Sequence, residues 1–425
     1  MRLCYIKTPH IRSAVSDIME AWIEASISGG MIMLRIKETQ LKSVKRATMF
    51  PDTYFVSKFG VSPYRGCQHA CAYCDGRSEK YFVEGVFDED IEVRLNTAQI
   101  LDSTLTKSRE WGIVGVSSGV SDAYQPIEKK YKIMPDVLDV LIKHRSPAYI
   151  MTKSDLPLRD LVKWKRLNEV AGATLFVSLT TVDDEIGHRF EPRAPLPSKR
   201  LEMIRQFKEA GIGVVALAMP FMPKITDMPE LIDELLSKLK ELDVDAIMPG
   251  GMTLRPGCQK KWFMDQLEEY NPELVSFYEK LYRENKQSGA PLNSYTVAQA
   301  KYLSSQLRKY DFLEILPHHL YQGRLQIYDE LWVLLTHMLK IYSRRGVDVT
   351  KLSASRKKYG AWLEVQKKSF NRNRTLTGND LDSQFGFMIQ TGEFHKLIEN
   401  DKLADFLISV VVERKQLNYR SLKLE

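Results

Sequence analysis

Cysteine is scarce in this sequence, and three of its five cysteines lie close together at positions 67, 71 and 74. An odd number of cysteines with three crowded together is not the pattern of a disulfide framework. In a reducing compartment such a group more often binds a metal or takes part in catalysis. The sequence therefore predicts an intracellular metal or catalytic site rather than a disulfide-stabilised secreted protein.

Long hydrophobic runs are missing as well. No stretch approaches the roughly 20 apolar residues that a membrane helix needs. The first thirty residues lack the charged start, apolar run and cleavage site of a signal peptide. We therefore expect a cytoplasmic protein with no membrane segment. The excess of one charge is also small, because 61 basic residues stand against 54 acidic ones. The net charge of +7 permits an anionic partner such as nucleic acid without arguing for one.

The length of 425 residues suits one large domain with an appendage or two domains, at roughly 100–200 residues per domain. Residues 1–30 stand apart, because apolar positions recur there at helical spacing before Gly29 and Gly30 break the pattern. A docking helix and an untranslated segment ahead of a start at Met31 or Met33 are the two alternatives. We expect the remaining chain to divide into a core of residues 31–260, a helical extension of residues 261–329 and a helical domain of residues 330–425.

Short apolar runs alternate with amphipathic helical patterns from about residue 54 onward. We expect strands at 53–57, 113–117, 148–152, 174–179, 213–218 and 246–248, and helices near 97–108, 135–144, 158–168, 198–210 and 228–241. This rhythm predicts an α/β fold of parallel strands with crossover helices. Six units would form a partial (β/α)6 barrel, whose chemistry belongs at the carboxyl ends of its strands. An open doubly wound sheet is the alternative.

The strand pattern stops beyond residue 260. Helical stretches follow near 261–285, 295–309, 325–344 and 395–415. They predict a helical appendage at the C-terminal end of the chain.

The spacing C-x3-C-x2-C of Cys67, Cys71 and Cys74 carries the strongest chemical signal. Gly66 allows the backbone to turn tightly before the first thiolate. Ordinary four-iron clusters have four cysteine ligands, so three thiolates leave one iron open, as catalytic metal sites do. An open iron can bind the amino and carboxylate groups of S-adenosylmethionine (SAM), and electron transfer into the sulfonium then generates a carbon radical. We therefore predict that these three cysteines are metal ligands with a catalytic role.

This spacing, with the aromatic Tyr73 before the third cysteine, resembles the radical SAM superfamily. Residues 62–75 resemble more narrowly the branch that contains spore photoproduct lyase and the DNA repair photolyase-like proteins. Further similar phrases follow in the expected order at 121–128, 152–155, 177–181 and 191–195, so the resemblance covers about residues 50–320. The resemblance implies a [4Fe–4S] cluster, SAM, and an external electron donor similar to flavodoxin or ferredoxin. It also implies a lyase- or transferase-like enzyme that abstracts hydrogen from a nucleic acid or a small molecule.

The resemblance further implies a set of cofactor-binding residues near the strand ends: Tyr73, Ser117, Ser118, Lys153, Ser178, Glu191 and Arg193. It places Tyr73 at the adenine end of the cofactor. Ser117 and Ser118 match the region that binds the methionine amino group, where hydroxyls and backbone carbonyls accept hydrogen bonds. Strand-end serines that only form turns are the alternative.

The four remaining residues of this set follow later strands. Lys153 is expected to pair with the methionine carboxylate as a compact cation. Ser178 resembles the family's serine that hydrogen-bonds the cofactor. Glu191 and Arg193 are expected to hold ribose hydroxyls or the carboxylate, and an ion pair between the two that braces their loop is the alternative.

One departure from the branch concerns the hydrogen-atom donor. Spore photoproduct lyase is understood to use a cysteine after its second strand, where this chain has serines at 117, 118 and 121 and no cysteine. This difference argues against photoproduct repair. Tyr124 is a candidate for relaying a hydrogen atom or for simple packing, and Cys258 is expected to be a lone buried cysteine.

The competing interpretation of the cysteines is a zinc site in a nucleic-acid-binding protein without catalysis. Zinc takes four ligands, so His69, Cys258 or a distant histidine would have to complete the set. The adjacent pair His318 and His319 is expected to be structural.

A basic segment near the C-terminus is a candidate nucleic-acid surface. Its cations are Arg356, Lys357, Lys358, Lys367, Lys368, Arg372 and Arg374. Tyr359, Trp362 and Phe370 are interleaved with them. Cations that follow phosphates and aromatics that stack on bases are typical of single-strand binding. A helix with a solvated basic face and buried aromatics is the alternative.

Overall fold

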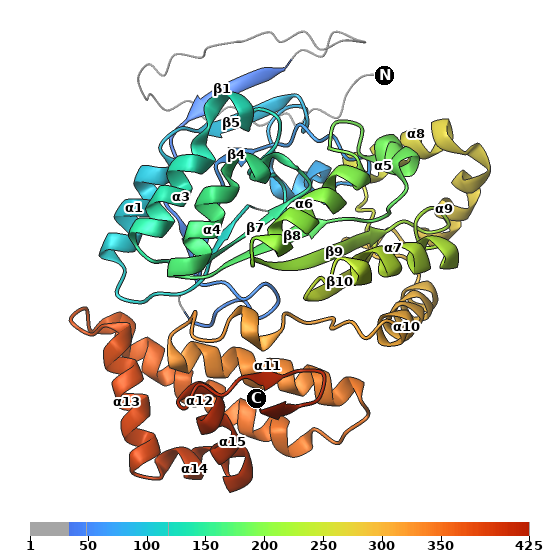
Figure 1. Ribbon diagram of the computed structural model, residues 1–425. Helices are drawn as coiled ribbons and strands as arrows, with labels where there is room; N and C mark the ends of the chain where they lie inside the picture. The colour runs from blue at the N-terminus through green and yellow to red at the C-terminus, as the bar shows by residue number, and fades with distance from the viewer. Residues whose placement is uncertain (1–33, 48, 118, 425) are drawn as a thin grey trace.

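The computed structural model describes residues 34–47, 49–117 and 119–424. The segment 1–30 and Ser118 lie outside the described residues, so the predictions made for them stay predictions. Figure 1 shows an α/β part above a smaller helical part built from the C-terminal end of the chain. None of the helices in the described ranges is long and apolar enough to cross a membrane.

A seven-stranded sheet forms the centre of the α/β part, with the order β10-β9-β8-β7-β6-β3-β2. Six of its strands are parallel: β3 (Phe59–Val61), β6 (Val114–Val116), β7 (Ala148–Thr152), β8 (Ala173–Ser178), β9 (Gly213–Phe221) and β10 (Ala246–Gly251). The edge strand β2 (Lys45–Arg46) pairs antiparallel with β3. The parallel strands follow one another in chain order without the reversal of a doubly wound sheet. The predicted partial (β/α)6 arrangement is therefore confirmed, and the doubly wound alternative is wrong.

Helices cover the outer face of this sheet (Figure 1). They are α1 (Thr97–Lys107), α3 (Ile133–Lys143), α4 (Leu161–Val170), α6 (Pro197–Glu209) and α7 (Pro229–Glu241). Their apolar stripes pack on strands such as β8, whose six residues are all buried. Burial on both faces explains why the strands appear in the sequence as continuous apolar runs.

The first parallel strand is not where the sequence predicted it. Residues 53–56 form a turn between Asp52 and Ser57 rather than a strand, because the Asp52 carboxylate accepts hydrogen bonds from the amides of Tyr54 and Phe55. The strand is Phe59–Val61 instead. This shift brings the strand end to within six residues of Cys67.

Short elements connect and flank the main strands. A small sheet of order β1-β5-β4 precedes and follows the cysteines in the sequence. Its strands are β1 (Arg35–Thr39), β4 (Tyr64–Arg65) and β5 (Asp90–Arg94). The short helices are η1 (Asp75–Arg77), η2 (Glu79–Tyr81), α2 (Glu128–Tyr131), η3 (Leu156–Asp160) and α5 (Asp184–Phe190).

Helices follow the last strand, as predicted, but the first is interrupted. The elements are α8 (Cys258–Tyr270), η4 (Pro272–Leu274), α9 (Val275–Leu281) and α10 (Asn293–Lys309). The predicted helix 261–285 ends at Asn271, which is extended and caps the next turn through its side chain. Pro272 has no N–H to continue the helix.

The C-terminal part is helical and has an apolar cluster of its own. It contains η5 (His318–Leu320), α11 (Ile327–Arg344), α12 (Thr350–Arg372), α13 (Gly378–Gln390), α14 (Glu393–Ile398) and α15 (Asp401–Val411), with a short hairpin of β11 (Leu417–Asn418) and β12 (Lys423–Leu424). The predicted helix 395–415 is two helices, because Glu399 is left-handed and Asn400 caps a new helix start. The proposed domain boundaries stay a prediction.

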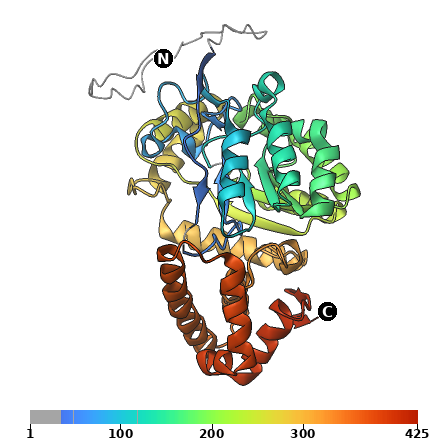
Figure 2. The same cartoon turned by 90° about the vertical axis from the view of Figure 1, so that its left-hand side faces the viewer.

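The two parts meet at the amino ends of the strands. Leu316, Leu320, Leu325 and Val333 pack against inward-facing residues of the sheet such as Phe176. Figure 2 shows the C-terminal helices extending from this end of the α/β part. Since the cysteines follow the carboxyl end of β3, the helical part lies at the opposite end of the strands.

A buried ionic network joins the same two parts. Lys58 precedes β3, Glu110 precedes β6, and Asp329 and Lys367 belong to α11 and α12. The Lys58 Nζ lies 3.1 Å from Glu110 and 2.9 Å from Asp329, and Lys367 contacts the same two carboxylates. All four side chains are at most 1% exposed. Although burial alone raises the pKa of Glu110, the ammonium groups of Lys58 and Lys367 lower it to about 2.

The basic segment forms α12, and the structure corrects part of its predicted role. Lys367 is a buried member of the ionic network, so it is not a nucleic-acid contact. Tyr359 and Phe370 are buried in the C-terminal core, where they cannot stack on bases. Arg356 lies over the ring of Trp332 at 4.2 Å and donates to Thr336. These residues match the alternative of a helix with buried aromatics.

The other cations of the segment lie partly or fully at the surface. Lys358 pairs with Glu399, and Lys368 pairs with Glu364 at 2.7 Å. Lys357, Arg372 and Arg374 are exposed. A surface of this kind is typical of a solvated helix face.

Candidate functional site

The three cysteines lie on a loop at the carboxyl end of β3. Cys67 and Cys71 are buried, Cys74 is partly buried, and none of the cysteines in the described chain forms a disulfide. Gly66 has a φ of +76°, and a Cβ atom there would lie 2.6 Å from the carbonyl oxygen of Asp90. Glycine is therefore required for the turn that leads into Cys67.

One wall of this loop is held by the segment that follows β6. The Oε1 atom of Gln125 accepts from the amide of Gln68 at 2.8 Å, and its Nε2 atom donates to Gly66 at 3.1 Å. Gln68 in turn accepts from the amide of Ile127 at 2.5 Å, and the Ser121 hydroxyl donates to Gly66 at 3.1 Å. These contacts satisfy backbone groups that a buried loop would otherwise leave unpaired.

The opposite wall is held by two arginines that share one carboxylate. Arg77 donates to the carbonyl oxygens of Ala70 and Cys71, each at 3.3 Å, and lies 2.8 Å from Asp88. Arg193 lies 2.6 Å from the same carboxylate, and its amide donates to the carbonyl of His69. Arg193 therefore braces the cysteine loop and does not pair with Glu191.

The surroundings of the thiols disfavour their charged forms. Burial raises the pKa of all three thiols, to about 12 for Cys71. The carboxylate of Asp122 raises the pKa of Cys67 further. Metals bind thiolates, so a metal that binds here displaces protons from the thiols.

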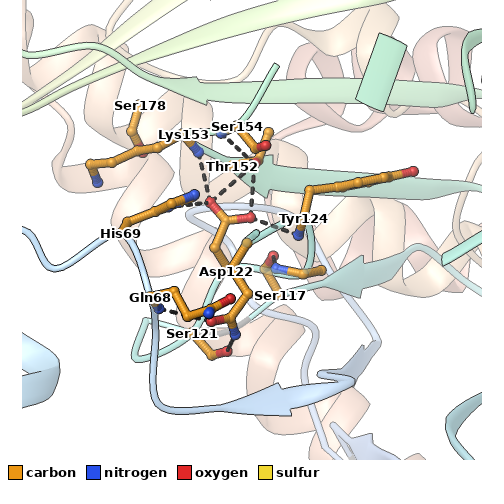
Figure 3. Close-up of polar contacts among 12 residues, drawn as sticks. Gln68, His69, Ser117, Ser121, Asp122, Tyr124, Thr152, Lys153, Ser154 and Ser178 are labelled. Atoms are coloured by element: carbon orange, nitrogen blue, oxygen red, sulfur yellow. Dashed lines mark hydrogen bonds and ion pairs between the residues drawn. The ribbon is translucent and has the colours of Figure 1, made fainter. Parts of the chain in front are cut away.

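Asp122 connects the cysteine loop to the end of β7. Its carboxylate accepts from the amide of Tyr124 at 2.8 Å, from the Thr152 hydroxyl at 2.8 Å and from the amide of Lys153 at 2.8 Å. The Nδ1 atom of His69 lies 3.4 Å from the same carboxylate. Figure 3 shows His69 and the Lys153 side chain on one side of Asp122 and the Tyr124 ring on the other. Asp122 therefore links the cysteine loop, through His69, to the backbone that follows β7.

A second group of charges lies beside the cysteines. Glu191 accepts from the Tyr73 hydroxyl and pairs with Arg200, and all three side chains are buried. Burial alone raises the pKa of Glu191, but Arg200 and Lys153 lower it below its ordinary value, so the group stays a carboxylate. Arg200 also donates to the Ser178 carbonyl at 3.0 Å. The predicted residues Tyr73, Ser178 and Glu191 therefore lie in one connected group.

Lys153 extends into the same region. Its Nζ atom lies 5.6 Å from the ring centre of Tyr73. Burial lowers the pKa of Lys153, but the neighbouring Cys71 and Glu191 raise it above its ordinary value. Among the described residues the ammonium group has no carboxylate within ion-pair distance, so a positive charge without a counter-ion faces the cysteine region.

Ser117 and Tyr124 have partners within the protein. The Ser117 hydroxyl donates to the Met151 carbonyl at 2.7 Å and accepts from the amide of Ala123 at 3.3 Å. Its φ of 122° is a strained conformation for a residue with a side chain. The Tyr124 hydroxyl donates to Asp160 at 2.9 Å and accepts from Trp164 at 3.1 Å. The Tyr124 ring is fully buried and its hydroxyl has these two partners, which favours the packing alternative, while the relay stays a prediction.

Comparisons with known proteins decide the family. The model of the radical SAM superfamily matches residues 61–236, a range that begins at β3 and contains the cysteine loop. An uncharacterised protein of Mycobacterium tuberculosis is 32% identical over 251 residues, which are 58% of this chain and 72% of that protein. This chain belongs to the radical SAM superfamily. Membership implies that SAM is cleaved at an iron–sulfur cluster with electrons from an external reductant.

Two further similarities accompany this match. An uncharacterised protein of Methanocaldococcus jannaschii is 30% identical over 179 residues, 42% of this chain and 66% of that protein. The structure of spore photoproduct lyase complexed with dinucleoside spore photoproduct is similar with a TM-score of 0.47 and 15% identity, over 68% of this chain and 80% of that one.

The residues present suit the cofactors that a radical SAM enzyme uses. Three buried cysteine thiols lie on one braced loop. The Lys153 ammonium suits a carboxylate. The Nε2 atom of His69 is buried and has no hydrogen-bond partner, as expected of an atom that a bound group contacts.

The residues proposed to complete a zinc site have other partners. His69 faces Asp122. Cys258 is partly buried rather than buried as expected, and its amide donates to Glu79 at 2.9 Å where α8 begins. His318 is buried against Glu330 at 3.2 Å, and His319 lies 3.0 Å from Asp245. Family membership favours the iron–sulfur interpretation of the cysteines.

Three residues of this radical SAM site were not assigned a role from the sequence. Arg200 sits within a helix, where its pattern is that of a surface arginine. Asp88 lies in an irregular segment with no motif. Asp122 lies in the segment 121–128, which resembles the family. That resemblance was the one sequence feature that could have indicated a role for it.

Proposed function

We propose that this protein holds a [4Fe–4S] cluster through Cys67, Cys71 and Cys74 and uses it to cleave SAM reductively. The observation that carries the proposal is the buried loop of three cysteines at the carboxyl end of the parallel strands, inside the range that matches the superfamily. Three cysteines leave the fourth iron open to SAM. The chemistry that the bound group supplies is one-electron cleavage of a carbon–sulfur bond, after which the carbon radical takes a hydrogen atom from a substrate.

The chain's own residues bind and orient SAM in this proposal. Lys153 pairs with the methionine carboxylate, because its ammonium group has no counter-ion among the described residues. Tyr73 and Ser178 contact the cofactor from two sides of the Glu191–Arg200 pair. Glu191 stays ionised and fixes the Tyr73 hydroxyl. Arg193 and Ser117 act indirectly, by holding the loops, and Ser118 keeps its predicted contact with the amino group.

The proposal is tested on anaerobically purified full-length protein. We expect close to four irons per chain and release of 5′-deoxyadenosine when dithionite and SAM are added. Cys71→Ala should abolish both the cluster signal and the product, whereas Cys258→Ala is a matched control that should keep them. A colourless protein that binds zinc, or unchanged product from Cys71→Ala, would refute the proposal.

The reductant is proposed to be a flavodoxin- or ferredoxin-like protein, and the substrate class includes nucleic acid and small molecules. A lyase-like and a transferase-like reaction both follow from this chemistry. Mass spectrometry of products after turnover with candidate substrates distinguishes the two, because a transferase joins a group to the substrate and a lyase divides it.

The nucleic-acid prediction now depends on the exposed cations of α12 and of the residues just after it: Lys357, Lys368, Arg372 and Arg374. Changing all four to methionine should weaken binding of single strands of any sequence. It should also reduce the slope of log K against log salt by about 0.7 for each lost contact. Fluorescence anisotropy from low to high salt measures both effects. Unchanged affinity and slope would remove α12 as the contact surface.

A further inference from the structure

His69 is a buried residue whose two ring nitrogens have different surroundings. The residue is 2% exposed and lies between Cys67 and Cys71 on the cysteine loop. Its Nδ1 atom faces the Asp122 carboxylate at 3.4 Å, and its Nε2 atom has no hydrogen-bond partner among the described residues. A buried polar atom without a partner destabilises the folded protein. The position of Nε2 therefore indicates a contact that a bound group supplies.

The Asp122 carboxylate determines what kind of group this is. A carboxylate only accepts hydrogen bonds, so the ring proton belongs on Nδ1 and Nε2 is left with a lone pair. Nε2 is then an acceptor, and its partner has to be a donor.

The charge of Asp122 adds a second, independent indication. The carboxylate is 8% exposed, and the other groups that donate to it are the amides of Tyr124 and Lys153 and the Thr152 hydroxyl, which are neutral. Among the described residues no lysine or arginine side chain pairs with it. Buried carboxylates are normally paired with a cation. The site at His69 and Asp122 is therefore negatively charged and favours a hydrogen-bond donor over an acceptor.

The polar groups of the site form two sides that together suit an amino acid. Its acceptor side is formed by Asp122 and His69, and its cationic side by Lys153, whose amide also binds Asp122. An amino group and a carboxylate on the same carbon match these two sides. The methionyl part of SAM carries both groups.

We propose that Nε2 of His69 accepts a hydrogen bond from an N–H of the amino group of the methionyl part of SAM, and that Asp122 orients the imidazole through Nδ1. This inference rests on the proposed function and assigns His69 as a positioning residue for the cofactor. It makes Asp122 and His69 the counterpart of Lys153, which takes the carboxylate.

Two substitutions test the contributions of the two ring nitrogens separately. His69→Asn keeps a nitrogen donor near the position of Nδ1 and has nothing at Nε2. His69→Gln reaches the position of Nε2 with an amide oxygen and loses the contact with Asp122. Each reconstituted full-length variant is first compared with the wild type for iron content, which reports whether the loop still holds the cluster.

The decisive measurement is the dissociation constant of SAM and of its keto analogue, in which a carbonyl replaces the α-amino group. His69→Asn should weaken binding of SAM about tenfold, since it removes the acceptor of a buried hydrogen bond. It should leave binding of the keto analogue unchanged, because that analogue has no amino group to make this contact. His69→Gln should retain SAM affinity within about threefold. The electron paramagnetic resonance signal of the reduced cluster should shift on SAM addition in the wild type and His69→Gln, and less in His69→Asn at the same SAM concentration.

Equal SAM affinity of the wild type and His69→Asn would overturn the inference while leaving the proposed function intact. So would an equal loss for SAM and the keto analogue, since that result shows a structural role. If His69→Asn fails to take up iron, a large loss of SAM affinity in iron-replete His69→Gln overturns the inference, and retained affinity supports it. A wild-type protein that holds no iron refutes the proposed function instead.

Discussion

Asp88 shows how much of this site depends on single residues outside any motif. Its carboxylate is 3% exposed and binds both Arg77 and Arg193, which in turn hold the cysteine loop. Asp88→Asn leaves two guanidinium groups without their shared charge, and breaking a buried pair costs about 3–5 kcal/mol. We expect the variant to lose iron faster to a chelator and to unfold at lower urea.

The matched control for this prediction is Asp102→Asn, which removes a carboxylate that pairs with Lys143 at the surface. Surface pairs contribute little to stability, so iron retention should stay as in the wild type. Equal iron retention in Asp88→Asn and the wild type would show that the loop does not need this brace.

At the scale of residues, the sequence predicted which side chains lie near the cysteines better than it predicted their partners. Tyr73, Lys153, Ser178 and Glu191 lie beside the cysteines, because strand ends of a parallel sheet converge at one edge. The partners come from elements whose positions depend on tertiary packing. Glu191 pairs with Arg200 rather than with Arg193, and no spacing rule in the sequence distinguishes these two arginines.

At the scale of elements, helix α12 is attached to the sheet by a buried charge. Lys367→Met removes one of two ammonium groups that share Glu110 and Asp329. One atom of Asp329, Oδ1, already lacks a hydrogen-bond partner. Arg46 and Lys58 still contact Glu110 after this change, and Lys58 still contacts Asp329. We expect a loss of about 1–3 kcal/mol in the free energy of unfolding, the general cost of buried polar groups that lose a partner. Urea denaturation followed by circular dichroism measures the loss.

Lys368→Met is the neighbouring control for this change. Lys368 pairs with Glu364 on the exposed face of α12, where its side chain is 58% exposed. Its substitution should leave the urea midpoint unchanged. Equal midpoints for the two variants would mean that the network does not hold α12 to the core.

The sequence predicted best those elements whose residues all share one environment. Strands such as β8 are buried on both faces and therefore appear as continuous apolar runs. The segment 53–57 has the composition of a strand, but the Asp52 side chain closes it into a turn. Helices α12 and α13 were not delimited, because α12 is rich in charged residues and one of its lysines is buried by a partner 257 residues away in the sequence.

At the scale of the whole molecule, stability should depend on pH through the C-terminal part. His337 is fully buried, its Nε2 lies 2.8 Å from the Thr53 carbonyl, and its Nδ1 lies 3.1 Å from the Tyr419 hydroxyl. Burial lowers the pKa of His337 to about 3. Below pH 6.5 the unfolded chain therefore binds a proton that the folded chain does not, so stability falls as the pH falls from about 6.5 toward 3. The full loss is on the order of 5 kcal/mol.

Asp382 opposes this dependence in part. Burial raises the pKa of its carboxyl to about 6, although Gln326 and neighbouring amides lower it. Between about pH 6 and its ordinary pKa the folded chain binds the additional proton, so Asp382 contributes stability as the pH falls. The wild-type profile between pH 4 and 7 should therefore be flatter than either residue alone would make it.

His337→Gln removes the acid-sensitive histidine, so its free energy of unfolding should rise relative to the wild type as the pH falls. Asp382→Asn should show the opposite trend. Parallel profiles for the wild type and both variants in urea denaturation at each pH would contradict this account, because neither group would then differ in proton binding between the folded and unfolded chains.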